Sequence, residues 1–195
     1  MDPAPSHELF PHIRIVMGMV IGLGITRLLT GIAGLIQHPK RHRRSAIHLM
    51  WVFSMLVELV LFWWWEFALS RVPNLNFGIF LFLIFYAITL FLISALLFPD
   101  DLDEYGDYEE FFLDRRRWFF GLFALTFFFD IVDTAIKGAE HWGQFSTAYV
   151  VQIPLGLALC VVACLTRRRS VQLAVAAFHI GYQFFWLATV LEATG

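Results

Sequence analysis

Four ionisable side chains, Arg27, Glu58, Asp130 and Asp133, lie deep inside apolar segments of this 195-residue chain. A charge at the centre of a membrane-spanning helix costs about 2.5–3.5 kcal/mol on insertion scales, so such residues usually have a partner or a role. Carboxylates in that setting can bind protons or hold a cation, and His179, in a further apolar segment, can titrate near neutral pH. The sequence therefore predicts a polar network of these five residues inside a membrane protein.

Depth along the helices indicates which of these groups pair. At a rise of about 1.5 Å per residue, Arg27 and Glu58 each lie within about 2 Å of the centres of their segments, so we expect an ion pair between them. Asp133 and Lys137 are four residues apart on one helical face and form a second candidate pair. One arginine cannot neutralise three carboxylates, so Lys137, a proton or a bound cation has to supply the missing positive charge.

Two interpretations of these charges remain open. In the first, Asp133, Asp130 and His179 line a water-filled path for protons or cations. In the second, Arg27 and Asp133 are satisfied by their partners, Asp130 is a neutral acid bonded to a backbone carbonyl, and the charges only set the registry of the helices. A cavity beside Asp130 would favour the first interpretation.

Six apolar segments have to position these residues. The chain is 59% hydrophobic with a mean hydropathy of +0.69, which is far more apolar than a soluble domain of this length. Each segment has about 20 residues, enough for a helix to cross a hydrocarbon core of about 30 Å. The predicted spans are 13–36, 46–69, 77–98, 118–136, 147–166 and 171–191. We predict an all-α polytopic membrane protein with one six-helix domain.

The basic residues predict the orientation of the domain. Six alternating crossings place three basic clusters on one side, whereas the opposite loops carry only Arg71 and Lys137. The clusters are Lys40, Arg41, Arg43 and Arg44, then Arg115–Arg117, then Arg167–Arg169. By the positive-inside rule they face the cytoplasm, with both termini on the non-cytoplasmic side, and we expect a bacterial inner membrane. The residues 99–117 are then an acidic cytoplasmic loop.

A ridge of small residues follows the first span. Gly18, Gly22, Thr26, Thr30 and Gly34 recur at every fourth position, which places them on one helical face. Small side chains let a second helix backbone approach closely in lipid. We therefore expect this small-residue ridge to pack against another helix, in the same chain or in a partner.

Several functions are disfavoured by the sequence. It contains no G-x-S-x-G, H-E-x-x-H, Walker, G-x-G-x-x-G or C-x-x-C motif, and Cys160 and Cys164 are expected to be packing residues on one helical face. We expect no metal and no cofactor. A net charge of −2 without a basic face argues against nucleic acid. The expected partners are the lipid bilayer and either a second copy of the chain or another membrane protein.

Three functions are compatible with these features. We expect a small proton- or cation-linked conduit or transporter that works as an oligomer. The alternative is a non-conducting auxiliary or assembly subunit of a membrane complex, which would use the small-residue ridge. The third is a membrane enzyme acting on a phosphorylated lipid, because the acidic run 100–104 precedes Arg115–Arg117 and could bind diphosphate through magnesium.

Overall fold

The computed structural model describes residues 6–39, 43–102 and 104–194, so Lys40, Arg41 and Asp103 lie outside the described residues. The described part contains six α-helices and one 3-10 helix, and all six α-helices are long and apolar enough to cross a membrane. Their bounds are α1 Ser6–Gln37, α2 Ala46–Trp65, η1 Glu66–Arg71, α3 Phe77–Ala95, α4 Tyr108–Ile136, α5 Ala139–Leu165 and α6 Arg169–Thr194. The predicted all-α membrane fold is confirmed.

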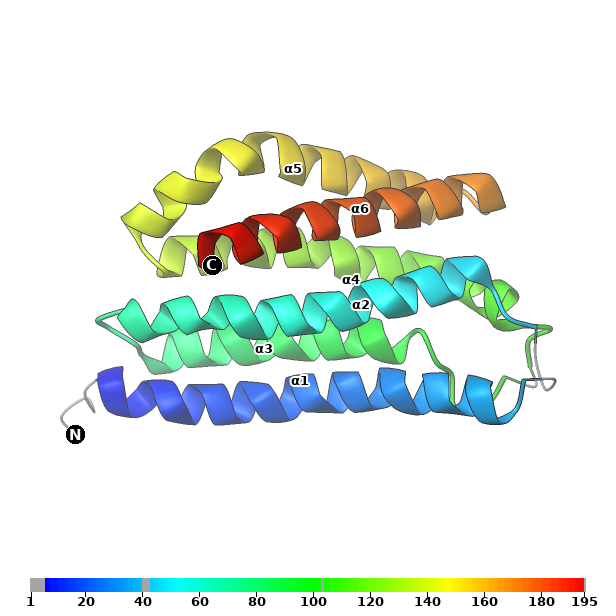
Figure 1. Cartoon of the computed structure of the whole chain (residues 1–195), viewed down its shortest axis with the longest axis horizontal. Coiled ribbons are helices and arrows are strands. Elements are labelled where there is room, and N and C mark those ends of the chain that lie inside the picture. The colour runs from blue at the N-terminus through cyan, green and yellow to red at the C-terminus, as the bar shows by residue number, and fades with distance from the viewer. Residues whose placement is uncertain (1–5, 40–42, 103, 195) are drawn as a thin grey trace.

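The helices run side by side along the long axis of the molecule (Figure 1). α1 packs against α3, α3 against α4 and α4 against α5, while α2 contacts α1, α3, α4 and α6. We call the end where α1, α3 and α5 end and α2, α4 and α6 begin the basic end. The start of α1 and the end of α6 both lie towards the opposite end, which we call the terminal end (Figure 1).

Side-chain caps fix where three helices begin. Ser45 accepts a hydrogen bond from the His48 backbone amide at the start of α2, and Asn76 does the same for Ile79 in α3. Asp107 accepts from the amides of Glu109 and Glu110, both at 2.9 Å, at the start of α4. Such caps satisfy amides that have no partner within the helix.

Several helix boundaries differ from the predicted spans. α4 begins at Tyr108, not at residue 118, so the predicted acidic loop 99–117 is a loop only up to the cap Asp107. The hydropathy profile missed this because residues 109–117 carry six charges, although Phe111 and Phe112 in the same stretch are buried. α1 and α5 also begin earlier than predicted, and α5 continues through Pro154.

The early end of α3 has a specific cause. α3 stops at Ala95, three residues before the predicted end, and Pro99 disfavours helical geometry at the residue before it. The carbonyl groups of residues 97 and 98 are then available to side chains of other helices. His48 Nε2 lies 2.6 Å from the Leu97 carbonyl oxygen.

Aromatic rings fill the core between α2 and α4 on the side of the basic end. The Trp51 ring lies 5.0 Å from that of Phe119 and 5.4 Å from that of Phe120, and Phe123 is 5.5 Å away. Phe112, which is closer to the basic end, contacts the Phe119 ring edge-to-face at 5.2 Å. These five residues, which are all buried, form what we call the aromatic cluster.

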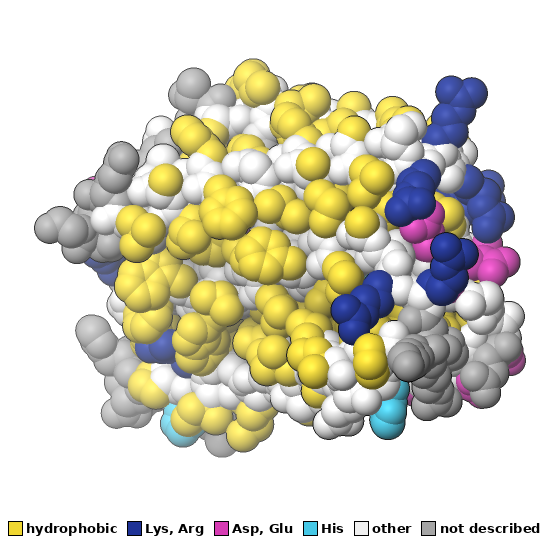
Figure 2. All heavy atoms as spheres, turned by 45° about the vertical axis from the view of Figure 1, so that its right-hand side comes forward, with side chains coloured by type: hydrophobic (Ala, Val, Ile, Leu, Met, Phe, Trp, Pro, Cys, Tyr) yellow, Lys and Arg dark blue, Asp and Glu magenta, His cyan; other side chains and the backbone are white. Residues whose placement is uncertain are grey.

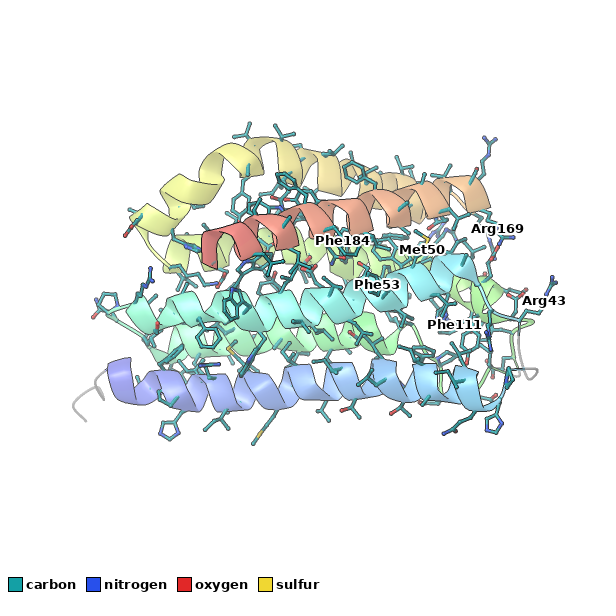
Figure 3. The ribbon with its side chains drawn as sticks, in the orientation of Figure 1. Arg43, Met50, Phe53, Phe111, Arg169 and Phe184 are labelled. Atoms are coloured by element: carbon teal, nitrogen blue, oxygen red, sulfur yellow. The ribbon has the colours of Figure 1, made fainter. Side chains whose placement is uncertain are left out.

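The outer surface matches a membrane environment. Hydrophobic side chains cover the middle of the face shown in Figure 2, and lysine and arginine gather mainly towards the basic end. Figure 3 shows Arg43 and Arg169 at that end, with Phe53 and Phe184 between α2 and α6. The rings of Phe53 and Phe184 stack at 6.1 Å, although both side chains are exposed. Exposed apolar groups of this kind suit contact with lipid.

The small-residue ridge of α1 faces mostly away from the bundle. Thr26 and Thr30 are exposed, and a Cβ added at Gly22 or Gly34 would meet no atom within 4 Å. At Gly18 the same test finds the Trp63 ring at 2.9 Å. The ridge is therefore free to contact a second protein over most of its length.

Gly31, on a different face of α1, allows a close approach by the Phe98 ring. A Cβ at Gly31 would overlap the Phe98 ring, so we expect Gly31→Ala to lower the free energy of unfolding by about 1–3 kcal/mol through overpacking. Gly34→Ala is the matched control, since a Cβ there meets nothing and should gain up to about 1 kcal/mol of helix propensity. Thermal unfolding in detergent measures both variants. Equal melting temperatures would contradict the prediction.

Candidate functional site

Arg27 does not pair with Glu58, so that prediction is wrong. Its Nη2 donates to the Phe98 carbonyl oxygen at 2.6 Å and to Asp100 Oδ1 at 2.5 Å. The reason is position: α1 begins at Ser6, which moves its midpoint and leaves Arg27 about 8 Å nearer the basic end than the helix centre. The early end of α3 then presents acceptors within reach of the guanidinium.

The Arg27–Asp100 ion pair should contribute little to stability. The Asp100 side chain is 91% exposed and that of Arg27 is 34% exposed, so water screens the attraction. We expect Asp100→Ala to change the free energy of unfolding by less than about 1 kcal/mol, as is usual for exposed pairs. Thermal unfolding with and without added salt tests this. A large loss of stability that does not depend on salt would contradict this prediction, because it would mean that water does not screen the pair.

The other four predicted residues line one cavity of about 150 Å³. Among the described residues, its lining comes from α2, α4, α5 and α6, and includes Glu58, Asp130, Asp133 and His179. One water needs about 10–15 Å³ by this kind of measure, so the cavity holds several waters or a small ligand. The structure therefore brings together four of the five residues of the predicted network and leaves Arg27 outside it.

Glu58 is held by α6. Gln183 Nε2 donates to Glu58 Oε2 at 2.7 Å and also to the Ser54 carbonyl oxygen at 3.1 Å. One turn earlier on α6, His179 Nδ1 lies 2.8 Å from Ser54 Oγ, and its ring packs between Trp51 and Phe123. These bonds join the middle of α2 to α6 across the cavity wall.

The two aspartates of α4 have different partners. Tyr86 of α3 donates its hydroxyl proton to Asp130 Oδ1. Asp133 forms an ion pair with Lys137, which confirms the second predicted pair, and Lys137 Nζ also lies 3.0 Å from Glu66 Oε1. Glu66 and the Lys137 side chain are 1% and 2% exposed, so this triad is buried.

The site contains more negative than positive charge. Glu58, Glu66, Asp130 and Asp133 face one lysine, which leaves an excess of three negative charges when all five groups are ionised. Lys137 stays charged: burial lowers its pKa, but Asp133 and Glu66 outweigh burial and raise it.

His141 does not supply the missing charge. It lines the cavity near the terminal end, and burial, Lys137 and Arg71 all lower its pKa. His141 is therefore neutral at neutral pH. Protons or a bound cation have to balance the remaining carboxylates.

Several buried polar atoms of the residues that line the cavity have no hydrogen-bond partner in the part of the chain that the structure describes. The oxygen atoms Asp133 Oδ1, Gln152 Oε1 and Gln183 Oε1 accept no hydrogen bond, and Trp51 Nε1 donates none. An unsatisfied buried polar atom costs about 1–3 kcal/mol. The cavity is therefore suited to an occupant that donates hydrogen bonds.

Sequence reasoning predicts no role for Glu66 and Tyr86, and it identifies Gln183 only as a further polar residue in an apolar segment. Glu66 lies near the end of a predicted span, and Tyr86 carries no charge. Sequence spacing does not indicate the partners of these three residues, because the partners lie on other elements. Only the local pair Asp133–Lys137 has a signal in the sequence, namely its i,i+4 spacing.

Comparison with known proteins gives no family for this chain. No protein-family model, no curated protein and no solved structure matches it. The function therefore has to be argued from the acidic cavity itself.

Proposed function

We propose that this protein is a small proton- or cation-linked conduit or transporter that works as an oligomer in the bacterial inner membrane. The observation that carries the proposal is the cavity between α2, α4, α5 and α6, where carboxylates outnumber the one lysine. Ionisable groups inside a membrane protein that face a cavity mark ion or proton pathways. Asp130 and Glu58, which have no cationic partner among the described residues, are the groups that exchange protons or hold the cation.

The aromatic cluster sets the limit of the cavity. The lining includes Trp51, Phe120 and Phe123, whereas Phe112 and Phe119, nearer the basic end, are buried and outside it. A hydrophobic constriction of this kind blocks ions by excluding water. In the proposed mechanism, the cavity exchanges with the terminal end, and movement of α4 against α2 opens the aromatic cluster.

The proposed orientation in the membrane follows from the basic residues at one end of the bundle. Arg43, Arg44, Arg115–Arg117 and Arg167–Arg169 belong to the basic end, which we assign to the cytoplasm by the positive-inside rule. The termini and Lys137 are then on the outer side. The cavity accordingly takes its proton or cation from outside the cell.

The oligomer is supported by the small-residue ridge of α1. Most of this ridge faces out of the bundle, where small residues permit close contact with another helix. Replacing Gly22 and Thr26 together with leucine should convert the oligomer to monomers in size-exclusion chromatography with light scattering. Met19→Leu is the control, because the exposed side chain of Met19 is already large.

Flux in proteoliposomes tests the proposal directly. The purified protein is reconstituted with a pH-sensitive dye inside, and sodium, potassium and proton gradients are imposed in turn. We expect faster dye response than in protein-free liposomes under at least one gradient. An oligomer that gives no flux under any of them would refute the conduit and leave the auxiliary subunit, which the outward-facing ridge also permits.

A further inference from the structure

We propose that the cavity binds a protonated primary amine that carries an apolar group. This rests on the proposed function and names the class of cation that the site takes. Three properties of the cavity support it: its free hydrogen-bond acceptors, its excess of carboxylates and its aromatic walls. Each excludes a different competing occupant.

The unpaired acceptor atoms of the lining residues favour an occupant with N–H or O–H groups. Gln183 is 4% exposed, and its Nε2 is committed to Ser54 and Glu58 while its Oε1 has no partner. Asp133 Oδ1 also has no hydrogen-bond partner, because Lys137 binds the other carboxylate oxygen, Oδ2. A primary ammonium group donates three hydrogen bonds and accepts none, which matches this surplus of acceptors.

The charge balance requires the occupant to be positive. Lys137 already serves Glu66 and Asp133, so Glu58 and Asp130 have hydrogen-bond donors, Gln183 and Tyr86, but no cation. A monovalent ammonium ion beside them reduces the excess negative charge. A neutral alcohol would satisfy the acceptors but leave that charge unbalanced.

The walls of the cavity favour an organic cation over a metal ion. Within the described residues, no group of three or more histidine, cysteine, aspartate or glutamate side chains could hold a metal ion. The polar groups are instead separated by aromatic and aliphatic side chains. The aromatic lining residues include Trp51, Phe123, Tyr182 and Trp186. Such rings bury an apolar substituent and attract a cation to their faces.

Ligand binding to the wild-type protein tests the proposal without any variant. The probes are phenethylammonium, its N-trimethylated analogue, phenethyl alcohol and sodium chloride, titrated at pH 7 into the protein in nanodiscs. Quenching of tryptophan fluorescence and isothermal calorimetry report binding. We expect saturable binding of phenethylammonium, about tenfold or more tighter than both analogues, which corresponds to about 1.4 kcal/mol.

Two variants locate the site. Glu58→Gln keeps the size and the bond from Gln183 but removes the charge, so it should weaken phenethylammonium binding by about tenfold. Asp114→Asn is the control, because Asp114 pairs with Arg167 near the basic end, outside the cavity. It should bind as the wild type does.

The outcomes separate this proposal from the proposed function. Equal affinity for the ammonium ion, the trimethylated analogue and the alcohol, or no binding of any, overturns the amine assignment. If flux of protons or inorganic cations is nevertheless observed, the conduit stands and only its substrate class is wrong. Selective amine binding without any flux supports the amine site and refutes transport.

Discussion

Lys137→Met is expected to lower the free energy of unfolding by about 3–5 kcal/mol, the range found when one partner of a buried ion pair is removed. The ammonium group of Lys137 binds Asp133 and Glu66, which are 7% and 1% exposed. Without it, two buried carboxylates face each other with no cation. Thermal unfolding in detergent, followed by fluorescence-detected size-exclusion chromatography, measures the loss.

Two further variants show whether the loss of stability comes from the two carboxylates that are left without a cation. Adding Asp133→Asn and Glu66→Gln to Lys137→Met removes the carboxylates and should recover a large part of the stability. Arg71→Met removes an exposed basic residue at the terminal end and should have little effect. A Lys137→Met protein as stable as the wild type would show that water or protons already neutralise the triad.

The fold could be predicted because it depends on properties summed over long segments. Six blocks of apolar residues are sufficient to specify six membrane helices, and α2 begins at the predicted residue because Ser45 caps it. The start of α4 could not be predicted in the same way. The charges around residues 109–117 lower the local hydropathy, although the cap Asp107 and the buried Phe111 and Phe112 belong to one continuous helix.

The site was predictable only where its contacts are local. Asp133 and Lys137 are one helical turn apart, so their pairing could be inferred from spacing alone. Pairing Arg27 with Glu58 relied on depth measured from the middle of each hydropathy block, and that measure failed because α1 extends to Ser6. Depth also does not say which helices are neighbours. Gln183 could be assigned to Glu58 only once α6 was known to pack on α2.

Asp130→Asn is expected to lower the flux in proteoliposomes by about tenfold or more, the effect of about 1.4 kcal/mol on a barrier. Asp130 lines the cavity, and its carboxylate has a hydroxyl partner, Tyr86, but no cation. An asparagine side chain accepts the same hydrogen bond from Tyr86, so the local structure should be kept. It cannot exchange a proton or attract a cation, and the flux should therefore fall at every pH.

Stability and a matched pair of variants distinguish this effect from misfolding. Asp130→Asn should unfold within about 1 kcal/mol of the wild type or be more stable, since it removes a partly buried charge that has no counter-ion among the described residues. Tyr86→Phe keeps the carboxylate and removes only its donor, so flux should persist with an altered pH dependence, and Asp114→Asn should conduct as the wild type does. If Asp130→Asn conducts normally while Glu58→Gln does not, the pathway follows the α2–α6 side of the cavity and Asp130 is a structural acid held by α3.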